Sequence, residues 1–264
     1  MFELLALDID DTLTDQPSEI SSENLAAIRD AQSAGIFVTV ATGRGYLASS
    51  SVWEKLNVKG PVINYGGAIV MDTRTDGLLY ATEVGNELVH EALSFAGELN
   101  VHAQLYQGDN IVCGRDCEHV RRYVGRLGLP LVIEPDIGSI TWKNVPKVLY
   151  ITDPDNAQRI LPAVEERFMG RLKVSKSQAG FIELNHIDAN KGTGLIWVAK
   201  SLGIPMQKVA AMGDNTLDIE MIRSAGLGVA VGNAAPEIKA AADMVAPDCR
   251  DNAVAWLIRE VLLK

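Results

Sequence analysis

The chain has 264 residues, enough for one large domain or two smaller ones, and its 47% hydrophobic and 22% charged residues are typical of a globular protein. The formal net charge of −10 argues against nucleic acid as a partner, since two negative surfaces repel, although a local cluster could still hold a small anionic substrate. No stretch approaches the ~20 uninterrupted apolar residues that cross a bilayer, and residues 1–4 carry no basic leader of a signal peptide, so we expect no membrane partner and a cytoplasmic location.

The N-terminal part of the chain alternates short apolar runs with a helical pattern. The apolar run that precedes Asp8 is typical of a strand buried on both faces. A serine can cap the helix that follows, and Gly35 is placed to end it. The elements expected here are strands at 2–7, 37–41 and 62–64 and a helix that starts after Ser21 or Ser22.

The C-terminal part repeats this alternation of strands and helices. Such alternation implies βαβ units and a parallel sheet with helices on both faces. The expected fold class is therefore α/β, a doubly wound parallel-sheet core built from both ends of the chain, residues 1–84 and 185–264. The elements expected here are helices at 191–201, at 217–224 and from Ala253, and strands at 209–212 and 227–231.

The middle of the chain, residues 85–184, has a different pattern and is expected to form an inserted α+β domain. Its strands are longer and more polar, and Gly108-Asp109 is typical of a turn between two of them. An insertion between the halves of an open sheet would sit above the strand ends, where such folds bind ligands. The elements expected here are strands at 103–107, 110–113, 148–151, 172–177 and 181–184 and helices at 118–127 and 156–168.

An acidic motif, Asp8-Ile9-Asp10-Asp11-Thr12-Leu13, directly follows the first strand. Carboxylates at the end of a buried strand are unfavourable unless a positive charge neutralises them. Asp8 and Asp10 are two positions apart, so an extended backbone can aim both side chains toward one point. Magnesium favours oxygen ligands and commonly takes one or two carboxylates together with a substrate phosphate, which would explain the pair.

Two further motifs offer groups that could bind an anion. Thr42-Gly43-Arg44 follows the second strand, where a hydroxyl and the N–H groups of a glycine turn can form an anion-binding concavity. Lys191 opens the predicted helix at 191–201, and its ammonium suits a phosphate oxygen. Taken alone, each has a structural explanation, as an ordinary turn and as a solvated surface lysine.

A second acidic motif, Gly213-Asp214-Asn215-Thr216-Leu217-Asp218, follows the strand at 209–212. Asp214 and Asp218 are four positions apart and can face the same way at a helix start, although helix capping would also explain them. The ends of parallel strands converge on one edge of a sheet. Together the motifs would supply a nucleophile, a metal site and positive charge for a phosphoryl group.

These motifs, in this order, resemble the haloacid dehalogenase superfamily of phosphohydrolases. The patterns D-x-D-x-T-L, T-G-R, K-G-x-x-L and G-D-x-x-x-D are similar to those of its Cof-type branch, which carries a cap domain inserted between the second and third motifs. The resemblance implies magnesium-dependent hydrolysis of a small phosphomonoester through an aspartyl-phosphate. The substrate class it implies is a sugar phosphate or a phosphorylated small acid such as phosphoglycolate.

The resemblance also implies roles for the acidic residues. Asp8 would be the nucleophile, and Asp10 would protonate the leaving oxygen and then activate water. Asp8, the backbone carbonyl of Asp10 and Asp214 would hold magnesium, with Asp218 as a further ligand or as a neighbour that orients the ligands.

The phosphoryl oxygens would be held by Thr42, Gly43 and Lys191. Leu217 stands where the family has an asparagine, and Asn215 could supply the polar contact that this change removes. A sugar phosphomutase would use the same intermediate, and a sensor would bind phosphate esters without turnover, so both alternatives stay open. The sequence does not indicate an oligomeric state.

The three cysteines, Cys113, Cys117 and Cys249, do not form a disulfide framework, since their number is odd and no CxxC pattern occurs. Cys113, Cys117 and His119 have a spacing that could in principle bind zinc, but no fourth ligand is suggested nearby. Reduced thiols are therefore expected.

Overall fold

The computed structural model describes residues 1–15 and 19–264, which form two compact units. We call residues 1–80 with 190–264 the core unit and residues 81–189 the inserted unit. The sequence-based boundaries, 84/85 and 184/185, lie a few residues inside these limits. Val84 belongs to the inserted unit because its N–H donates to the carbonyl of Val145 and its side chain is buried in that unit's core. The last strand of the inserted unit also continues to His186.

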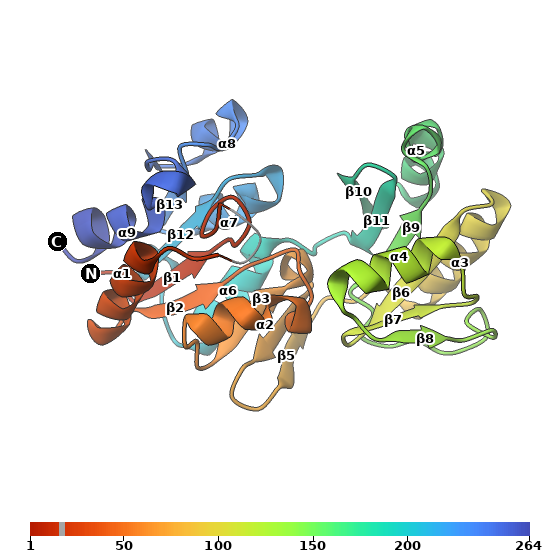
Figure 1. Ribbon diagram of the computed structural model, residues 1–264, viewed down its shortest axis with the longest axis horizontal. Helices are drawn as coiled ribbons and strands as arrows, with labels where there is room; N and C mark the ends of the chain where they lie inside the picture. Colours follow the sequence, from red (N-terminus) through yellow and green to blue (C-terminus); the bar gives the residue numbers. More distant parts are fainter. Residues whose placement is uncertain (16–18) are drawn as a thin grey trace. The chain divides into compact units, whose positions relative to one another are not determined.

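The core unit is built on a five-stranded parallel sheet in the order β14-β13-β12-β1-β2, which confirms the expected doubly wound fold class (Figure 1). A three-stranded sheet, β3-β4-β5, continues from it through a bridge between Ala41 and Ile63. The strands are β1 Leu4–Leu7, β2 Phe37–Val40, β3 Pro61–Asn64, β4 Ile69–Asp72, β5 Gly77–Ala81, β12 Val209–Gly213, β13 Leu227–Ala230 and β14 Met244–Val245.

Strand β1 is apolar at every position because it is buried on both faces. Leu5 and Leu7 pack with residues of α1, α2 and α9, whereas Leu4 and Ala6 pack with residues of α6 on the opposite face. The helices of the core unit are α1 Ser22–Ser33, α2 Tyr46–Lys55, α6 Lys191–Ser201, α7 Ile219–Ser224, α8 Pro236–Ala241 and α9 Ala253–Leu257, the last continued by a π-helical turn at Ile258–Leu262.

The predicted signals for α1 are confirmed in detail. The Ser21 side chain accepts the N–H of Asn24, and Gly35 adopts a φ of +89° just past the helix. The helix expected from Leu217 differs, because the chain first makes a 3₁₀ turn at Thr216–Asp218 and becomes α-helical only afterwards. None of the helices in the described ranges is long and apolar enough to span a bilayer.

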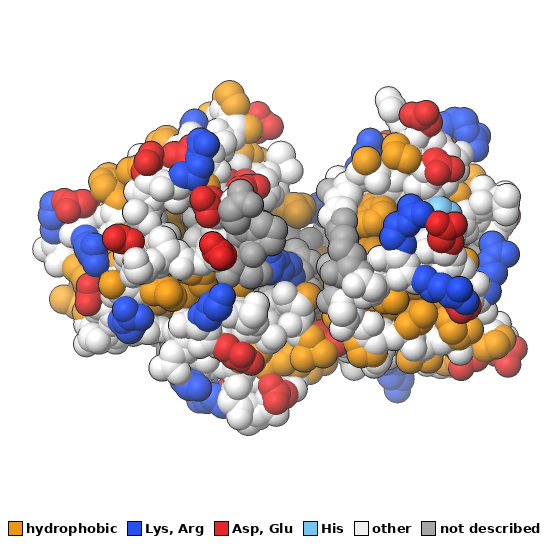
Figure 2. Space-filling view, viewed as in Figure 1, with side chains coloured by type: hydrophobic (Ala, Val, Ile, Leu, Met, Phe, Trp, Pro, Cys, Tyr) orange, Lys and Arg blue, Asp and Glu red, His pale blue; other side chains and the backbone are white. Residues whose placement is uncertain are grey.

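The inserted unit contains a six-stranded sheet in the order β10-β11-β9-β6-β7-β8. Helices α3 and α5 share one hydrophobic cluster with this sheet and therefore cover the same face of it. Figure 2 shows acidic and basic side chains interspersed over the visible face of each unit. The elements are α3 Asn86–Glu98, β6 His102–Gln107, β7 Asn110–Cys113, α4 Glu118–Leu127, β8 Leu131–Ile133, β9 Lys147–Ile151, α5 Pro154–Phe168, β10 Leu172–Gln178 and β11 Phe181–His186.

Candidate active site

The core sheet brings three of the predicted residues to one edge. Asp8 follows β1, Thr42 follows β2, and Asp214 follows β12, and β1 lies between the other two strands. Because the strands are parallel, their carboxyl ends lie side by side, where open α/β sheets bind ligands. The first residue of α6 is Lys191, and this helix start is fixed by a capping box between Asn190 and Thr193.

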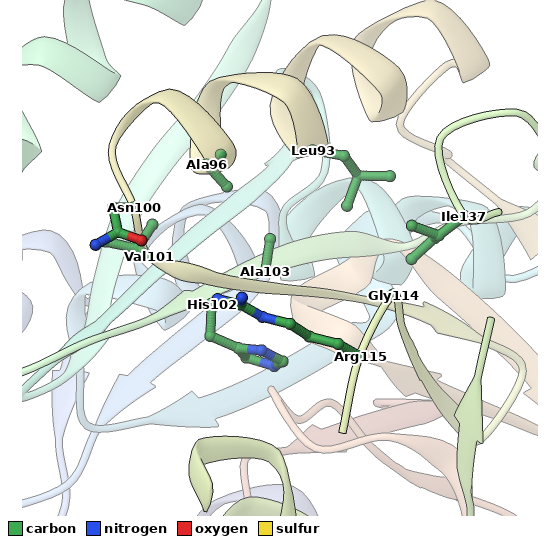
Figure 3. A pocket seen from close by; sticks show the side chains of 10 residues that line it. Leu93, Ala96, Asn100, Val101, His102, Ala103, Gly114, Arg115 and Ile137 are labelled. Carbon is green, nitrogen blue, oxygen red and sulfur yellow. The ribbon is translucent and has the colours of Figure 1, made fainter. Parts of the chain in front are cut away.

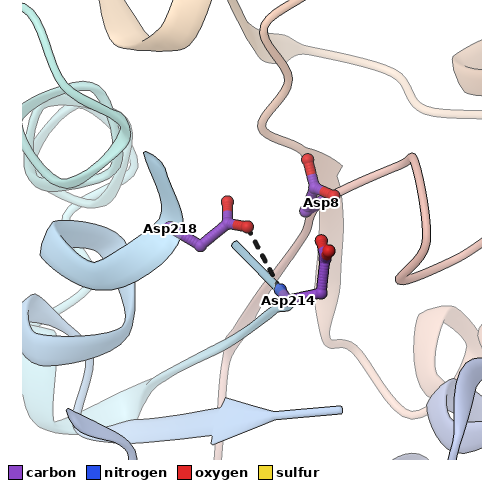
Figure 4. A group of neighbouring side chains, drawn as sticks. All are labelled: Asp8, Asp214 and Asp218. Atoms are coloured by element: carbon purple, nitrogen blue, oxygen red, sulfur yellow. Dashed lines mark hydrogen bonds between the residues drawn. The ribbon is translucent and has the colours of Figure 1, made fainter. Parts of the chain in front are cut away.

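Three carboxylates meet at this edge. Asp8, Asp214 and Asp218 each have an oxygen within 4.8 Å of the other two (Figure 4). The Asp8 and Asp218 side chains are buried, and Asp214 is partly buried. Oδ2 of Asp218 accepts the backbone N–H groups of Asp214 and Asn215, both at 3.1 Å. Asp218 therefore holds the loop after β12 in place and keeps Asp214 beside Asp8.

Lys191 lies between two of these carboxylates. Its Nζ donates to Oδ1 of Asp8 and to Oδ1 of Asp218, both at 2.5 Å, and the residue is only 1% exposed. Burial alone would lower the pKa of Lys191, but the charges of Asp218 and Asp8 raise it above the ordinary value. The ammonium therefore stays charged inside the protein. It can compensate only part of the negative charge of three carboxylates.

The second oxygen of Asp8 differs from the first. Oδ2 of Asp8 is buried, and no group in the part of the chain that the structure describes donates a hydrogen bond to it. Burial and then the neighbouring charge of Asp218 raise the pKa of Asp8, against the opposing effect of Lys191. The same two causes raise the pKa of Asp214 to about 6. Carboxylate oxygens gathered in this way, one of them unsatisfied, fit a hard divalent cation, for which Asp8 and Asp214 offer the available oxygens.

We expect Mg²⁺ to stabilise the protein, in a manner that depends on Asp214. At a concentration about a hundred times Kd, binding to the folded state adds ~2.7 kcal/mol, or roughly 5–10 °C in Tm for a unit of this size. Asp214→Asn should abolish most of this shift. Because the pKa of Asp214 is raised to about 6 in the folded state, its ionised form destabilises the folded protein above that pH. The variant lacks this charge and should therefore be more stable than wild type at pH 7.5 without metal.

Thermal denaturation at pH 7.5, with and without MgCl₂ at constant ionic strength, measures both effects. The matched control is Asp30→Asn, which changes an exposed carboxylate on α1 and should leave the Mg²⁺ response intact. An equal Mg²⁺-induced shift in wild type and Asp214→Asn would contradict the assignment of the metal site.

Asp10 lies apart from the three grouped side chains. Its carboxylate is 53% exposed and is bound bidentately by Arg44, with Nε at 3.0 Å and Nη2 at 2.5 Å. The family resemblance implies a metal contact through the backbone carbonyl of Asp10. The grouping of carboxylate side chains does not test that contact. No role for Arg44 was predicted from the sequence. Its position in the motif Thr42-Gly43-Arg44 could have indicated a role at the site. In the structure, the backbone N–H of Arg44 donates to the Thr42 hydroxyl at 3.1 Å, which holds the arginine at the end of the strand.

The remaining predicted phosphate ligands follow the two strands on either side of β1. Thr42 and Gly43 follow β2, and Asn215 follows β12. Thr42 is buried, and no atom lies within 4 Å of the position where a Cβ on Gly43 would be, so the backbone there faces open space. The Asn215 side chain contacts its own loop, since its Oδ1 accepts the N–H of Leu217 and its Nδ2 lies 3.3 Å from Asp214 Oδ1. Leu217 itself is 39% exposed and makes no polar side-chain contact.

Two supporting residues could not be identified from sequence. Thr12 donates its hydroxyl to Asp214 Oδ1 at 3.1 Å, linking the two acidic loops. Asn64 is fully buried and donates to the Ser49 hydroxyl at 2.9 Å, while its Oδ1 has no partner. The turn after Asn64 also packs on the start of α6, where a Cβ on Gly67 would come within 1.9 Å of the Asn190 carbonyl oxygen. Gly67 is therefore required for the close approach that places α6.

Comparisons with known proteins agree with this arrangement. A family model described as haloacid dehalogenase-like hydrolase matches residues 5–258. Phosphatase YwpJ of Bacillus subtilis is 31% identical over 290 residues, which cover 98% of this chain and 99% of that protein. The 5-amino-6-(5-phospho-D-ribitylamino)uracil phosphatase YcsE of the same organism is 28% identical over 270 residues, covering 98% and 96% of the two chains.

Solved structures also share the fold of this chain. The crystal structure of a haloacid dehalogenase-like hydrolase from Bacteroides thetaiotaomicron superposes with a TM-score of 0.87, at 26% identity, over 99% of this chain and 100% of that one. The family model spans almost the whole chain, and one relative exceeds 30% identity over nearly its full length. The chain therefore belongs to the haloacid dehalogenase-like hydrolases.

Proposed function

We propose that this hydrolase is a magnesium-dependent phosphatase that cleaves small phosphomonoesters, with Asp8 as the nucleophile. One observation carries the proposal: Asp8 is buried at the end of β1, its Oδ1 is bound by Lys191 at 2.5 Å, and its Oδ2 is free of hydrogen bonds. Such a carboxylate is oriented by one oxygen and can react through the other. The names of the relatives as phosphatases support the same reaction class.

In the first step, Oδ2 of Asp8 attacks the phosphorus of the ester, and the bond from phosphorus to the leaving oxygen breaks. The side chain of Asp10 gives its proton to that oxygen, and an alcohol departs. In the second step, Asp10 takes a proton from water, whose oxygen attacks the phosphorus and releases inorganic phosphate and the Asp8 carboxylate. A divalent cation held by Asp214 and by Oδ1 of Asp8, the oxygen that does not attack, would supply positive charge for the phosphoryl oxygens.

The other predicted residues would orient the phosphoryl group and the acids. We assign Thr42 and Gly43 to the phosphoryl oxygens, together with Lys191, whose charge lies next to the reacting carboxylate. Arg44 would hold the ionised carboxylate of Asp10 through two hydrogen bonds, the form that takes the proton of water in the second step. The protonated form that acts in the first step would keep at most one of these bonds. Electrostatic positioning of this kind accounts for most of the catalysis of phosphoryl transfer.

For the substrate we propose a sugar or polyol phosphate or a phosphorylated small acid. The Bacillus subtilis relative YcsE is named for a substrate that carries its phosphate on a ribityl chain, which supports a polyol phosphate ester. The net charge of −10 makes a small substrate held by local positive charge more suitable than a polyanion.

We expect Mg²⁺-dependent release of inorganic phosphate from p-nitrophenyl phosphate and from a panel of sugar, polyol and small-acid phosphates. Free phosphate, with no isomerised sugar phosphate among the products, is the outcome for a phosphatase. A mutase would return an isomerised ester, and a sensor would bind esters tightly in calorimetry without turnover. Either of those results would replace the proposal.

A further inference from the structure

The inserted unit contains a second cluster of reactive side chains, separate from the grouped carboxylates of the core unit. The Sγ of Cys117 lies 3.3 Å from Nδ1 of His102, and Nε2 of the same imidazole lies 3.1 Å from Oε1 of Gln104. His102 and Gln104 are neighbours on one face of β6, and Cys117 is the N-cap residue of α4. The three side chains thus form a line of thiol, imidazole and amide.

The orientation of the Gln104 amide assigns the tautomer of His102. With its oxygen facing Nε2 of His102, Nε2 carries the hydrogen and Nδ1 keeps a lone pair that faces the sulfur. Burial is the main cause that lowers the pKa of His102, so the imidazole is neutral near pH 7 and able to take the proton of the thiol. A nucleophile beside a base that a third group orients is the arrangement expected of an activated side chain.

Gln104 adds a second observation. The residue is fully buried, and its Nε2 has no hydrogen-bond partner among the residues that the structure describes. A buried donor without an acceptor is unfavourable by about 1–3 kcal/mol, so a group of this kind calls for an explanation. The amide is therefore oriented by its bond to His102 and leaves an unused donor within the cluster.

Cys117 differs from the other two cysteines. Cys113 and Cys249 are buried, and burial raises the pKa of each thiol to about 11. Cys117 is only partly buried and stands at the start of a ten-residue helix, where the helix dipole favours negative charge. In the described ranges the only side chains grouped for a metal are the three aspartates of the core unit, so zinc does not explain the cluster.

We propose that Cys117 is a nucleophilic thiol activated by His102, and that it is the site at which peroxides and other small electrophiles modify this chain. With a peroxide, the sulfur attacks one oxygen, an S–O bond forms, and the O–O bond breaks. Cys117 becomes a sulfenic acid, and the released hydroxide takes the proton that His102 had accepted, which gives water. His102 also lines a cavity of about 320 Å³ beside the start of β6 (Figure 3).

Charged groups of both signs lie near this thiol, which stands between Asp116 and Glu118 in the chain. Arg115 lies close enough to oppose protonation of His102, as does His119 on α4, whose ring stacks on that of His102 at 6.4 Å between centroids. Arg121, one turn into α4, is paired with Asp116. Arg115 and His119 therefore favour a neutral His102 before the thiol reacts, which leaves Nδ1 free to accept the proton of Cys117.

The test is iodoacetamide labelling of the full chain at pH 7, followed by peptide mass spectrometry of all three cysteines. Cys117 should react faster in the folded chain than in the same chain unfolded in urea, whereas Cys113 and Cys249 should react more slowly when folded. His102→Asn should lower the rate at Cys117 by roughly tenfold or more, because it removes the base. The matched control His186→Asn changes a partly exposed imidazole at the end of β11, away from the strand end that pairs near His102, and should change the rate less than twofold.

A peroxide arm completes the experiment. After a brief treatment of wild type with hydrogen peroxide, dimedone should label Cys117 and neither buried cysteine, and His102→Asn should lose this label. The comparison of folded with unfolded wild type requires no variant, so it decides the question even if His102→Asn does not fold. Slower labelling of Cys117 in the folded chain than in urea, or equal rates in wild type and a folded His102→Asn, would overturn the proposal.

Discussion

Asp8→Asn should lower kcat by at least about a thousandfold, since loss of the nucleophile in a covalent enzyme reduces the rate by up to about 10⁶. The amide has nearly the shape of the carboxylate, so it preserves packing at the end of β1 while removing the charge that attacks phosphorus. It also removes one of the carboxylates that raise the pKa of Lys191. The measurement is phosphate release at saturating Mg²⁺ and substrate, on protein whose melting temperature has been verified.

Asp11→Asn is the matched control for this prediction. Asp11 is an exposed neighbour of the nucleophile in the same motif, with a φ of +59° that asparagine also adopts readily. Its substitution should change kcat less than about twofold, because the side chain is exposed, is not one of the three grouped carboxylates and is only a minor cause of the raised pKa of Asp214. Activity of Asp8→Asn within tenfold of wild type would remove Asp8 from the role of nucleophile.

Lys191→Met should destabilise the metal-free protein by about 3–5 kcal/mol, the penalty for leaving a buried charge without its partner. The ammonium is 1% exposed and is bonded at 2.5 Å to both Asp8 and Asp218. Methionine fills much of the same volume but leaves two buried carboxylates facing each other. Urea denaturation at pH 7.5 measures the change in the free energy of unfolding.

Lys208→Met provides the contrast, because Lys208 pairs with Glu3 at the same distance of 2.5 Å but both side chains are more than 40% exposed. Exposed pairs contribute about 0–1 kcal/mol, so this variant should differ little from wild type. If the two lysine variants lost the same free energy, Lys191 would not hold the buried carboxylates as described.

The sequence predicted the elements whose signals are local. Buried runs of apolar residues marked β1, β2, β12 and β13, and the Ser21 cap marked α1, because burial on both faces and N-capping each leave a recognisable pattern. The alternation of these elements was sufficient to derive the parallel sheet. The positions of Asp8, Thr42 and Asp214 at one edge then followed from the direction of the strands.

Other elements were missed for different physical reasons. The α3 helix has apolar residues at Val89, Ala92 and Ala96, a helical spacing that a fuller reading of residues 86–98 would have found. The α2 helix contains the run Ser49-Ser50-Ser51, and serines are poor evidence for a helix interior. The two-residue strand β14 exists only because it pairs with β13, which is a tertiary effect.

Several contacts at the site could not be predicted from the sequence, because they join residues that are far apart in the chain. The pairing of Arg44 with Asp10 and the bond from Thr12 to Asp214 join residues 34 and 202 positions apart. No motif spacing indicates that Lys191 bridges Asp8 and Asp218 instead of standing at the surface. These contacts depend on the sheet order, so they become visible only when the chain is folded.

The most direct test of the central claim is to trap the phosphorylated carboxylate. Wild type would be quenched in acid during steady-state turnover and reduced with borohydride, which converts an acyl phosphate on aspartate to homoserine, and position 8 would be read by peptide mass spectrometry. The account predicts homoserine at position 8 in proportion to the phosphorylated enzyme, and none without substrate. Turnover with an unmodified Asp8, or with the phosphoryl group on another residue, would contradict it.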